Sequence, residues 1–188
     1  VKQILAFSRQ SEEERKPLFI AHTVKEVLKF MRASLPATVE IRQRLDSDLG
    51  YVLADPVQIH QVVMNLCTNA LHAMKDKGGV LEVQLTSTIL GHEHDAIHPD
   101  FKPGPYAKLV VKDTGHGMDK ATMERIFDPY FTTKEKGVGT GLGLAMVYTI
   151  VQQHGGRIRA SSDPGQWAEF QFEFPQPIPA AGHAGSES

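Results

Sequence analysis

Four glycines alternate with other residues in the run KEKGVGTGLGL, which occupies residues 134–144. Glycine loses more chain entropy on ordering than other residues do, so such a run is unfavourable in a purely structural role. It does leave backbone N–H groups free to approach a large anion closely. The pattern after it predicts a helix over residues 142–154, and the N-terminus of a helix favours negative charge. The run therefore predicts phosphate binding at the start of a helix.

Two familiar phosphate loops do not match this run. In a Walker A loop a lysine and a serine or threonine follow the glycines, whereas Lys134 and Lys136 precede them here. A dinucleotide-binding loop needs Gly or Ala three residues after its second glycine, where this chain has Leu142 or Met146. The preceding residues also lack the apolar run of a buried parallel strand. Both kinds of loop are therefore excluded.

The composition suits one domain with a core and short appendages. The chain has 188 residues, of which 41% are hydrophobic and 22% charged, and its net charge is −2. This balance does not favour nucleic acid as a partner. The single cysteine, Cys67, excludes an intramolecular disulfide and is expected in the core. We expect neither a membrane span nor a signal peptide, because no apolar run has the required length or position.

Hydrophobic periodicity divides the middle of the chain into helices and strands. The predicted helices cover residues 22–34, 56–75, 120–126 and 142–154. The predicted strands cover residues 18–21, 39–45, 51–54, 80–90, 106–112, 157–162 and 169–174. Asp55 is the expected N-cap of the longest helix, with Pro56 at its first position.

Three polar side chains share one side of that helix. Asn65, Asn69 and His72 are spaced by four and three residues. A solvated helix face would explain them. Alternatively, an asparagine oxygen could ligate Mg²⁺, which prefers hard oxygen ligands while it bridges phosphates, and His72 could bind a phosphate from the same side.

Asp113 ends a predicted strand and is followed by Gly115 and Gly117. An aspartate before glycines is most often a turn residue. At the floor of a pocket, however, its carboxylate could accept a hydrogen bond from the exocyclic amine of adenine, and the glycines would leave room for the flat base. Guanine presents a carbonyl at that position and would be disfavoured.

Four segments resemble, in order, the N, G1, F and G2 boxes of the catalytic ATP-binding domain of bacterial sensor histidine kinases, in the GHKL superfamily. They are residues 65–70 (NLCTNA), 113–117 (DTGHG), 127–134 (FDPYFTTK) and 137–143 (GVGTGLG). The resemblance covers roughly residues 17–175. It implies an α+β fold, a two-layer α/β sandwich in which a mixed sheet packs on about three helices and ATP lies under a mobile lid.

The resemblance implies ATP and Mg²⁺ as cofactors and catalytic roles for Asn65, Asn69 and Lys134. Asn69 would ligate Mg²⁺, His72 would assist at the phosphates and Asp113 would bind adenine. The other implied ATP-binding residues are Gly115, Gly117, Phe131, Gly139, Thr140, Gly141, Leu142 and Gly143. Residues 127–139 would form the lid, and we expect residues 132–140 to be poorly ordered without nucleotide.

The resemblance also implies domains and partners. Residues 1–16, which begin with helical spacing, would be the end of the dimerisation and phosphoacceptor helix plus a linker. Residues 17–175 would be the catalytic domain and 176–188 a disordered tail. Because the chain begins abruptly, we expect a longer, homodimeric parent that supplies its own dimerisation domain and acts on a response-regulator receiver domain. The domain would be cytoplasmic, and the parent's membrane anchoring is left open.

The chain departs from the family in two places. None of its nine histidines has the acceptor context, a histidine followed by an acidic residue and then a proline, so the acceptor segment is missing. The final box, usually Gly-x-Gly-Thr/Ser-x-Phe, reads GQWAEF at residues 165–170. Separately, His92, His94 and His98 lie in a polar loop that we interpret as solvated rather than metal-binding.

The N box favours a kinase over an ATPase. Hydrolytic relatives carry a glutamate four residues before the Mg²⁺-binding asparagine, as a general base for water. Here that position is Asn65, which has no basicity to offer. Transfer of the γ-phosphate to a histidine is therefore the favoured function. A GHKL-type ATPase and a non-catalytic nucleotide-binding scaffold remain the alternatives.

Overall fold

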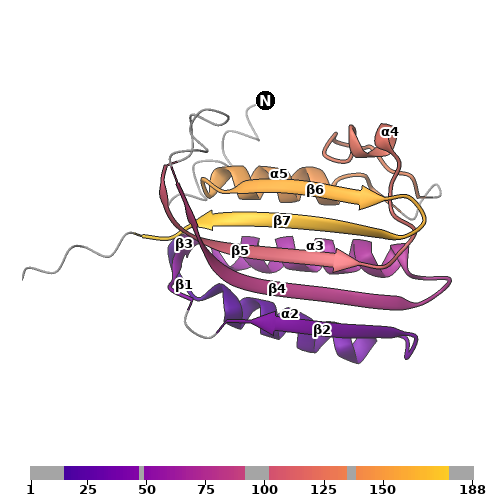
Figure 1. The fold of residues 1–188 in the computed structure, drawn as a ribbon, viewed down its shortest axis with the longest axis horizontal. Helices are drawn as coiled ribbons and strands as arrows, with labels where there is room; N and C mark the ends of the chain where they lie inside the picture. Colours follow the sequence, from indigo (N-terminus) through magenta and orange to yellow (C-terminus); the bar gives the residue numbers. More distant parts are fainter. Residues whose placement is uncertain (1–14, 47–48, 92–101, 135–138, 178–188) are drawn as a thin grey trace, which may run out of the picture.

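The computed structural model describes residues 15–46, 49–91, 102–134 and 139–177. It has two layers, with helices packed on one face of a mixed sheet (Figure 1). The sheet has five strands in the order β2-β4-β5-β7-β6. Their bounds are Val39–Leu45 for β2, Gly79–Leu90 for β4, Gly104–Asp113 for β5, Trp167–Pro175 for β7 and Arg157–Asp163 for β6. Only β2 and β4 pair in parallel.

Three long helices cover the sheet, and a short one lies beside it near the ends of β5 and β6 (Figure 1). The helices are α2 (Ile20–Ser34), α3 (Pro56–Ala73), α4 (Lys120–Met123) and α5 (Gly143–Gln153). Two further strands, β1 (Lys16–Leu18) and β3 (Val52–Ala54), form a separate antiparallel pair. The expected α+β sandwich is confirmed.

The core lies between the sheet and α3. Alternate residues of the central strands face the helices, and Leu109, Val111, Phe170 and Phe172 are buried there. Cys67 is fully buried among them, as expected, and burial raises the pKa of its thiol to about 12. Alternation along the strands gives the sheet one apolar face, and the helical period gives α3 one apolar stripe. These two surfaces pack on each other in a single apolar layer, which explains the sandwich.

Some boundaries differ from those expected. The strand predicted over residues 18–21 ends at Leu18, and α2 begins at Ile20. Ile20 is only 3% exposed and shares a helical stripe with Val24 and Val27, so its burial in the core favours helix over strand. The helix expected over residues 120–126 ends at Met123.

The start of α3 and the end of α5 are joined by hydrogen bonds. Asp55 caps α3 by accepting a hydrogen bond from the Val57 N–H at 2.8 Å. Its own N–H donates to Nε2 of His154 at 3.1 Å, while Nδ1–H of His154 donates to the Ile150 carbonyl at 2.8 Å. Burial lowers the pKa of His154, which favours this neutral ring. The two helices that lead into the site are thus fixed relative to one another.

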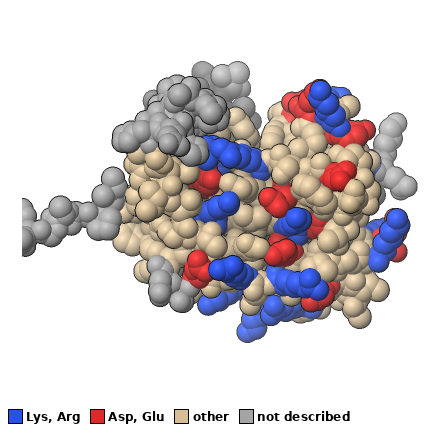
Figure 2. All heavy atoms as spheres, viewed as in Figure 1, with Lys and Arg blue, Asp and Glu red and all other residues tan. Residues whose placement is uncertain are grey.

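The other face of the sheet is polar and open. Figure 2 shows basic and acidic side chains interspersed over it. The strand register places Arg42 opposite Glu82, Glu82 opposite Lys112 and Lys112 opposite Glu169, so charge alternates across four strands. The Lys112 ammonium lies 3.7 Å from the Glu169 carboxylate and 4.7 Å from the Trp167 ring centroid. Opposite charges on facing residues stabilise the pairing modestly and leave this face solvated.

Several expectations fall outside the described residues. These are the end of the helix expected at the start of residues 1–16, the histidine loop at residues 92–98 and the tail beyond residue 177. Within the described part of the chain, no helix has the length and apolar character needed to cross a membrane.

Candidate nucleotide-binding site

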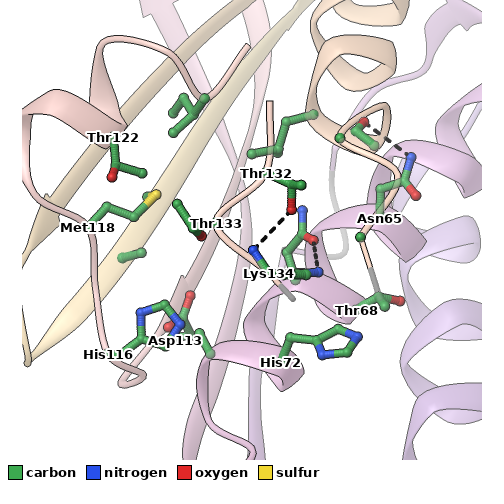
Figure 3. Close-up of a pocket in the computed structure, with 18 of the residues that line it drawn as sticks. Asn65, Thr68, His72, Asp113, His116, Met118, Thr122, Thr132, Thr133 and Lys134 are labelled. Atoms are coloured by element: carbon green, nitrogen blue, oxygen red, sulfur yellow. Dashed lines mark hydrogen bonds between the residues drawn. The ribbon is translucent and has the colours of Figure 1, made fainter. Parts of the chain in front are cut away.

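A cavity of about 650 Å³ opens between α3, the loop after β5, the segment before residue 134 and the start of α5 (Figure 3). This volume is within the range of small-molecule and cofactor sites. Asp113 and His116 lie together at one end of the cavity, and Asn65 and Lys134 lie at the other (Figure 3).

Asp113 forms the buried floor of the first end. The residue is 5% exposed, and its carboxylate accepts a hydrogen bond from the Gly115 N–H at 2.9 Å. Burial raises the pKa of Asp113 to about 6, although the Gly115 N–H and the nearby His116 act in the opposite direction. A ligand that donates a hydrogen bond to this carboxylate would relieve part of its desolvation.

The glycines of this loop are required by close packing. A Cβ on Gly115 would lie 2.5 Å from Cβ of Ala73 on α3. Gly117 has φ of +61°, and a Cβ there would collide with the Asp163 carbonyl oxygen. Gly117 lines the cavity, whereas Gly115 is not among the lining residues. The loop is thus held close against both α3 and the β6–β7 hairpin.

That hairpin contains the segment where the sequence departs from the family pattern. The Gly165 N–H donates to the His116 carbonyl at 2.6 Å, and the Met118 N–H donates to the Ser162 hydroxyl at 2.8 Å. The Ser162 hydroxyl in turn donates to the Trp167 carbonyl at 2.7 Å. The hairpin therefore holds the loop of residues 114–118 (the base loop) through the Gly165 backbone and the Ser162 side chain, despite its altered sequence.

The second end brings four predicted residues together. Asn65 Nδ2 donates to the Gly143 carbonyl at 3.4 Å, and Lys134 Nζ donates to Asn69 Oδ1 at 3.1 Å (Figure 3). Both asparagines lie on the cavity side of α3, and Gly143 begins α5. Lys134 is half-buried, and this burial lowers its pKa. Two amide side chains, one ammonium group and a helix N-terminus thus meet at one place.

The glycine run packs against the segment before it. Tyr130 has φ of +67°, and its N–H donates to the Gly141 carbonyl at 2.9 Å. Gly141 also has φ of +67°, and a Cβ there would collide with the Tyr130 backbone. A Cβ on Gly139 would lie 2.5 Å from Thr132 Oγ1. These close approaches explain two of the glycines, while residues 135–138 of the expected lid lie outside the described residues.

Most of the other predicted residues line the cavity. His72, Phe131 and Thr140 do so, and Leu142 does not; its N–H donates to Thr140 Oγ1 at 3.3 Å. The pKa of His72 is lowered by burial and by the charges of Lys134 and Lys75. The sequence reading missed further lining residues, namely Thr68, Ala73, Lys75, Asp76, His116, Met118, Thr122, Ile126, Thr132, Thr133, Leu144, Ala168 and Phe170.

Comparison with known proteins agrees with this geometry. Residues 54–178 match the family described as histidine kinase-, DNA gyrase B- and HSP90-like ATPase. Sensor kinase CckA of Brucella abortus (strain 2308) is 34% identical over 178 residues, which are 95% of this chain and 19% of that protein. AtoS of Escherichia coli (strain K12), a signal transduction histidine-protein kinase, is 31% identical over 176 residues, 93% of this chain and 26% of that protein.

The chain belongs to this family of ATPases, as a histidine kinase catalytic domain. A nucleotide-free catalytic domain of histidine kinase ThkA superposes with a TM-score of 0.67 at 25% identity, covering 86% of this chain and 95% of that one. Full-length ShkA in complex with AMPPNP superposes with a TM-score of 0.65 at 26% identity, covering 86% of this chain and 31% of that one. The chain spans about a fifth to a quarter of the curated relatives CckA and AtoS.

The donor set of this histidine kinase domain suits Mg²⁺ rather than a metal held by the protein alone. Among the described residues, no group of three or more His, Cys, Asp or Glu side chains is placed so that it could hold a metal ion. The Asn69 oxygen is a hard ligand that faces the cavity. Mg²⁺ keeps several waters and binds through few protein oxygens together with substrate phosphates, so one asparagine oxygen fits this mode.

Proposed function

We propose that this domain transfers the γ-phosphate of Mg-ATP to a histidine on the dimerisation domain of its parent protein. The bond between the γ-phosphorus and the β–γ bridging oxygen breaks, ADP leaves, and a bond forms from phosphorus to an imidazole nitrogen. The phosphate then passes to a response-regulator aspartate. The observation that carries the proposal is the meeting of Asn65, Asn69 and Lys134 at one end of a cavity whose other end holds Asp113.

The chain's own residues would position the nucleotide. The Asp113 carboxylate would accept a hydrogen bond from the adenine 6-amino group. The N-terminus of α5 would face the phosphates with its backbone N–H groups, aided by the closely packed glycines before it. Phosphoryl transfer depends mainly on such positioning and on charge stabilisation.

Two side chains would neutralise charge at the phosphates. Asn69 Oδ1 would ligate Mg²⁺, which would neutralise charge at the phosphates of the nucleotide. The Lys134 ammonium lies 3.1 Å from that oxygen, so it would be near the same phosphates. Asn65 and His72 would add hydrogen bonds from the same side of α3.

Asn65 also favours transfer over hydrolysis. Its amide donates to the Gly143 carbonyl and has no capacity to take a proton from water. The competing GHKL-type ATPase would need a base at this position. A non-catalytic scaffold would bind the nucleotide and transfer nothing.

The partners follow from this proposal. The domain would act on the dimerisation domain of its own homodimeric parent, on the cytoplasmic side where ATP and the response-regulator receiver domain are available. Residues 1–16 would be the connection to that dimerisation domain. CckA and AtoS are named as sensor and signal transduction kinases, which supports this arrangement.

Phosphotransfer in trans tests the proposal. The chain is incubated with ATP labelled at the γ-phosphate, Mg²⁺ and a separately produced dimerisation domain. We expect acid-labile label on the acceptor histidine, and none with Asn69→Ala. His60→Ala is the matched control, because His60 is exposed on α3 and does not line the cavity. Label released as phosphate would indicate an ATPase, and nucleotide binding without transfer or release would indicate a scaffold.

A further inference from the structure

His116 lies in the base loop between Gly115 and Gly117 and is held there from both sides. Its N–H donates to the Ala73 carbonyl on α3 at 3.2 Å, and its carbonyl accepts from the Gly165 N–H at 2.6 Å. The first contact fixes the loop to a helix and the second to the β6–β7 hairpin. The side chain therefore projects from a backbone whose position is set by two other parts of the fold.

The ring of His116 has a defined proton arrangement. Its Nδ1 lies 2.7 Å from the Gly117 carbonyl oxygen. A carbonyl oxygen only accepts, so Nδ1 carries the hydrogen and donates it. In the neutral ring Nε2 is then an acceptor, and within the described part of the chain it makes no hydrogen bond.

The His116 ring lies beside the buried carboxylate of Asp113. His116 and Asp113 both line the cavity, and the two appear side by side in Figure 3. The His116 ring is also close enough to Asp113 that, when both of its nitrogens carry a proton, its charge lowers the pKa of that carboxyl. One end of the cavity thus presents a carboxylate oxygen and an imidazole nitrogen, two acceptors of different chemistry.

We propose that His116 is a second recognition residue for the nucleotide base, whose Nε2 accepts a hydrogen bond from the 6-amino group. An adenine 6-amino group has two N–H bonds, so Asp113 and His116 can each take one. A 6-oxo base would place a carbonyl oxygen against both acceptors, and neither Asp113 nor His116 would receive a hydrogen bond. With Asp113 as the sole recognition residue, one acceptor would be left without a donor. This inference rests on the proposed binding of ATP with its base at Asp113. It identifies His116 as the residue that increases the selectivity for adenine.

The test removes the acceptor and the amine separately. Isothermal titration of the full chain measures the affinities for ATP and for purine riboside triphosphate, which lacks the 6-amino group. We expect His116→Ala to weaken ATP by about fivefold, the effect of one neutral hydrogen bond, and to leave the purine analogue nearly unchanged. His116→Gln, whose amide oxygen can replace the acceptor, should recover most of the ATP affinity.

The outcomes separate this inference from the proposed function. Unchanged ATP affinity in His116→Ala overturns the inference, and so does an equal loss for both ligands, which would mark a structural role. In either case Asp113→Asn must still weaken ATP if the proposed site is correct. Absence of ATP binding by the unsubstituted chain would instead overturn the proposed function. His60→Ala serves as the control for a histidine outside the cavity.

Discussion

The Lys134 ammonium donates a hydrogen bond to Asn69 Oδ1 at 3.1 Å, across 65 residues of sequence. The oxygen proposed to ligate Mg²⁺ is therefore already engaged by a cation. The amide oxygen has two lone pairs, but an ammonium group and a divalent cation on the same oxygen would lie close together and repel one another. Binding of Mg-nucleotide requires Lys134 to leave Asn69.

This competition predicts opposite effects of Lys134→Met on two nucleotides. With ATP the lysine exchanges Asn69 for the γ-phosphate, so its removal should weaken binding about tenfold, as for a charged hydrogen bond. With ADP there is no γ-phosphate, and removal of the Asn69 contact should strengthen binding about twofold to fivefold. Titration calorimetry in the presence of Mg²⁺ measures both. Equal changes for ATP and ADP would contradict the competition.

Asp113→Asn should weaken ATP by about 1–3 kcal/mol, the free energy of a hydrogen bond to a charged group. The asparagine keeps the size of the side chain, so a loss of affinity reports on the carboxylate. Calorimetry with ATP is the measurement. Glu40→Gln is the control, because it makes the same chemical change on exposed strand β2. An affinity equal to that of the unsubstituted chain would remove Asp113 from the site.

The raised pKa of Asp113 predicts a pH-dependent stability. Its pKa is about 6 in the folded chain and 3.8 in the reference state, so the folded chain binds the proton more tightly. The resulting stabilisation is fully present below pH 3.8 and is lost as the pH rises through about 6. Between pH 4.5 and 7.5 the unsubstituted chain should therefore lose about 2 kcal/mol relative to Asp113→Asn.

Urea unfolding at the two pH values measures this difference. The other carboxylates titrate in both chains, so their contributions to the free energy of unfolding cancel in the comparison with Asp113→Asn. Parallel pH dependence of the two chains would show that Asp113 has an ordinary pKa in the folded state.

Alanine substitutions at two glycines with similar φ angles distinguish the cost of a steric collision from the cost of backbone strain. Gly117 has φ of +61° and Gly165 has φ of +79°, but only at Gly117 would a Cβ collide, because Gly165 has open space around it. Gly165→Ala should reduce the free energy of unfolding by about 1 kcal/mol, from the left-handed backbone alone. Gly117→Ala should cost at least about 2 kcal/mol and also weaken ATP, because the base loop must shift.

Urea unfolding and ATP titration of both variants provide the check. Similar losses of stability at the two positions would mean that the base loop does not depend on its close approach to the hairpin.

Much of the fold follows from local patterns. The apolar stripe of α3, its Asp55 cap and the alternation in β5 and β7 depend only on neighbouring residues and were all predicted. The start of α2 was not, because Phe19 and Ile20 suit a strand as well as a helix. Burial of Ile20 against the core decides between them, and that burial exists only once the helix has packed.

The sequence by itself contains the four boxes in order, and these are sufficient to predict the family. The same boxes also predict most of the polar residues that face the cavity. Spacing along one helix already places Asn65 and Asn69 on one side, since the helical period is local. The tertiary structure alone decided that Lys134 engages Asn69 and that the β6–β7 hairpin clamps His116 beside Asp113. These contacts join segments far apart in the chain, so they depend on how the layers pack rather than on any local pattern.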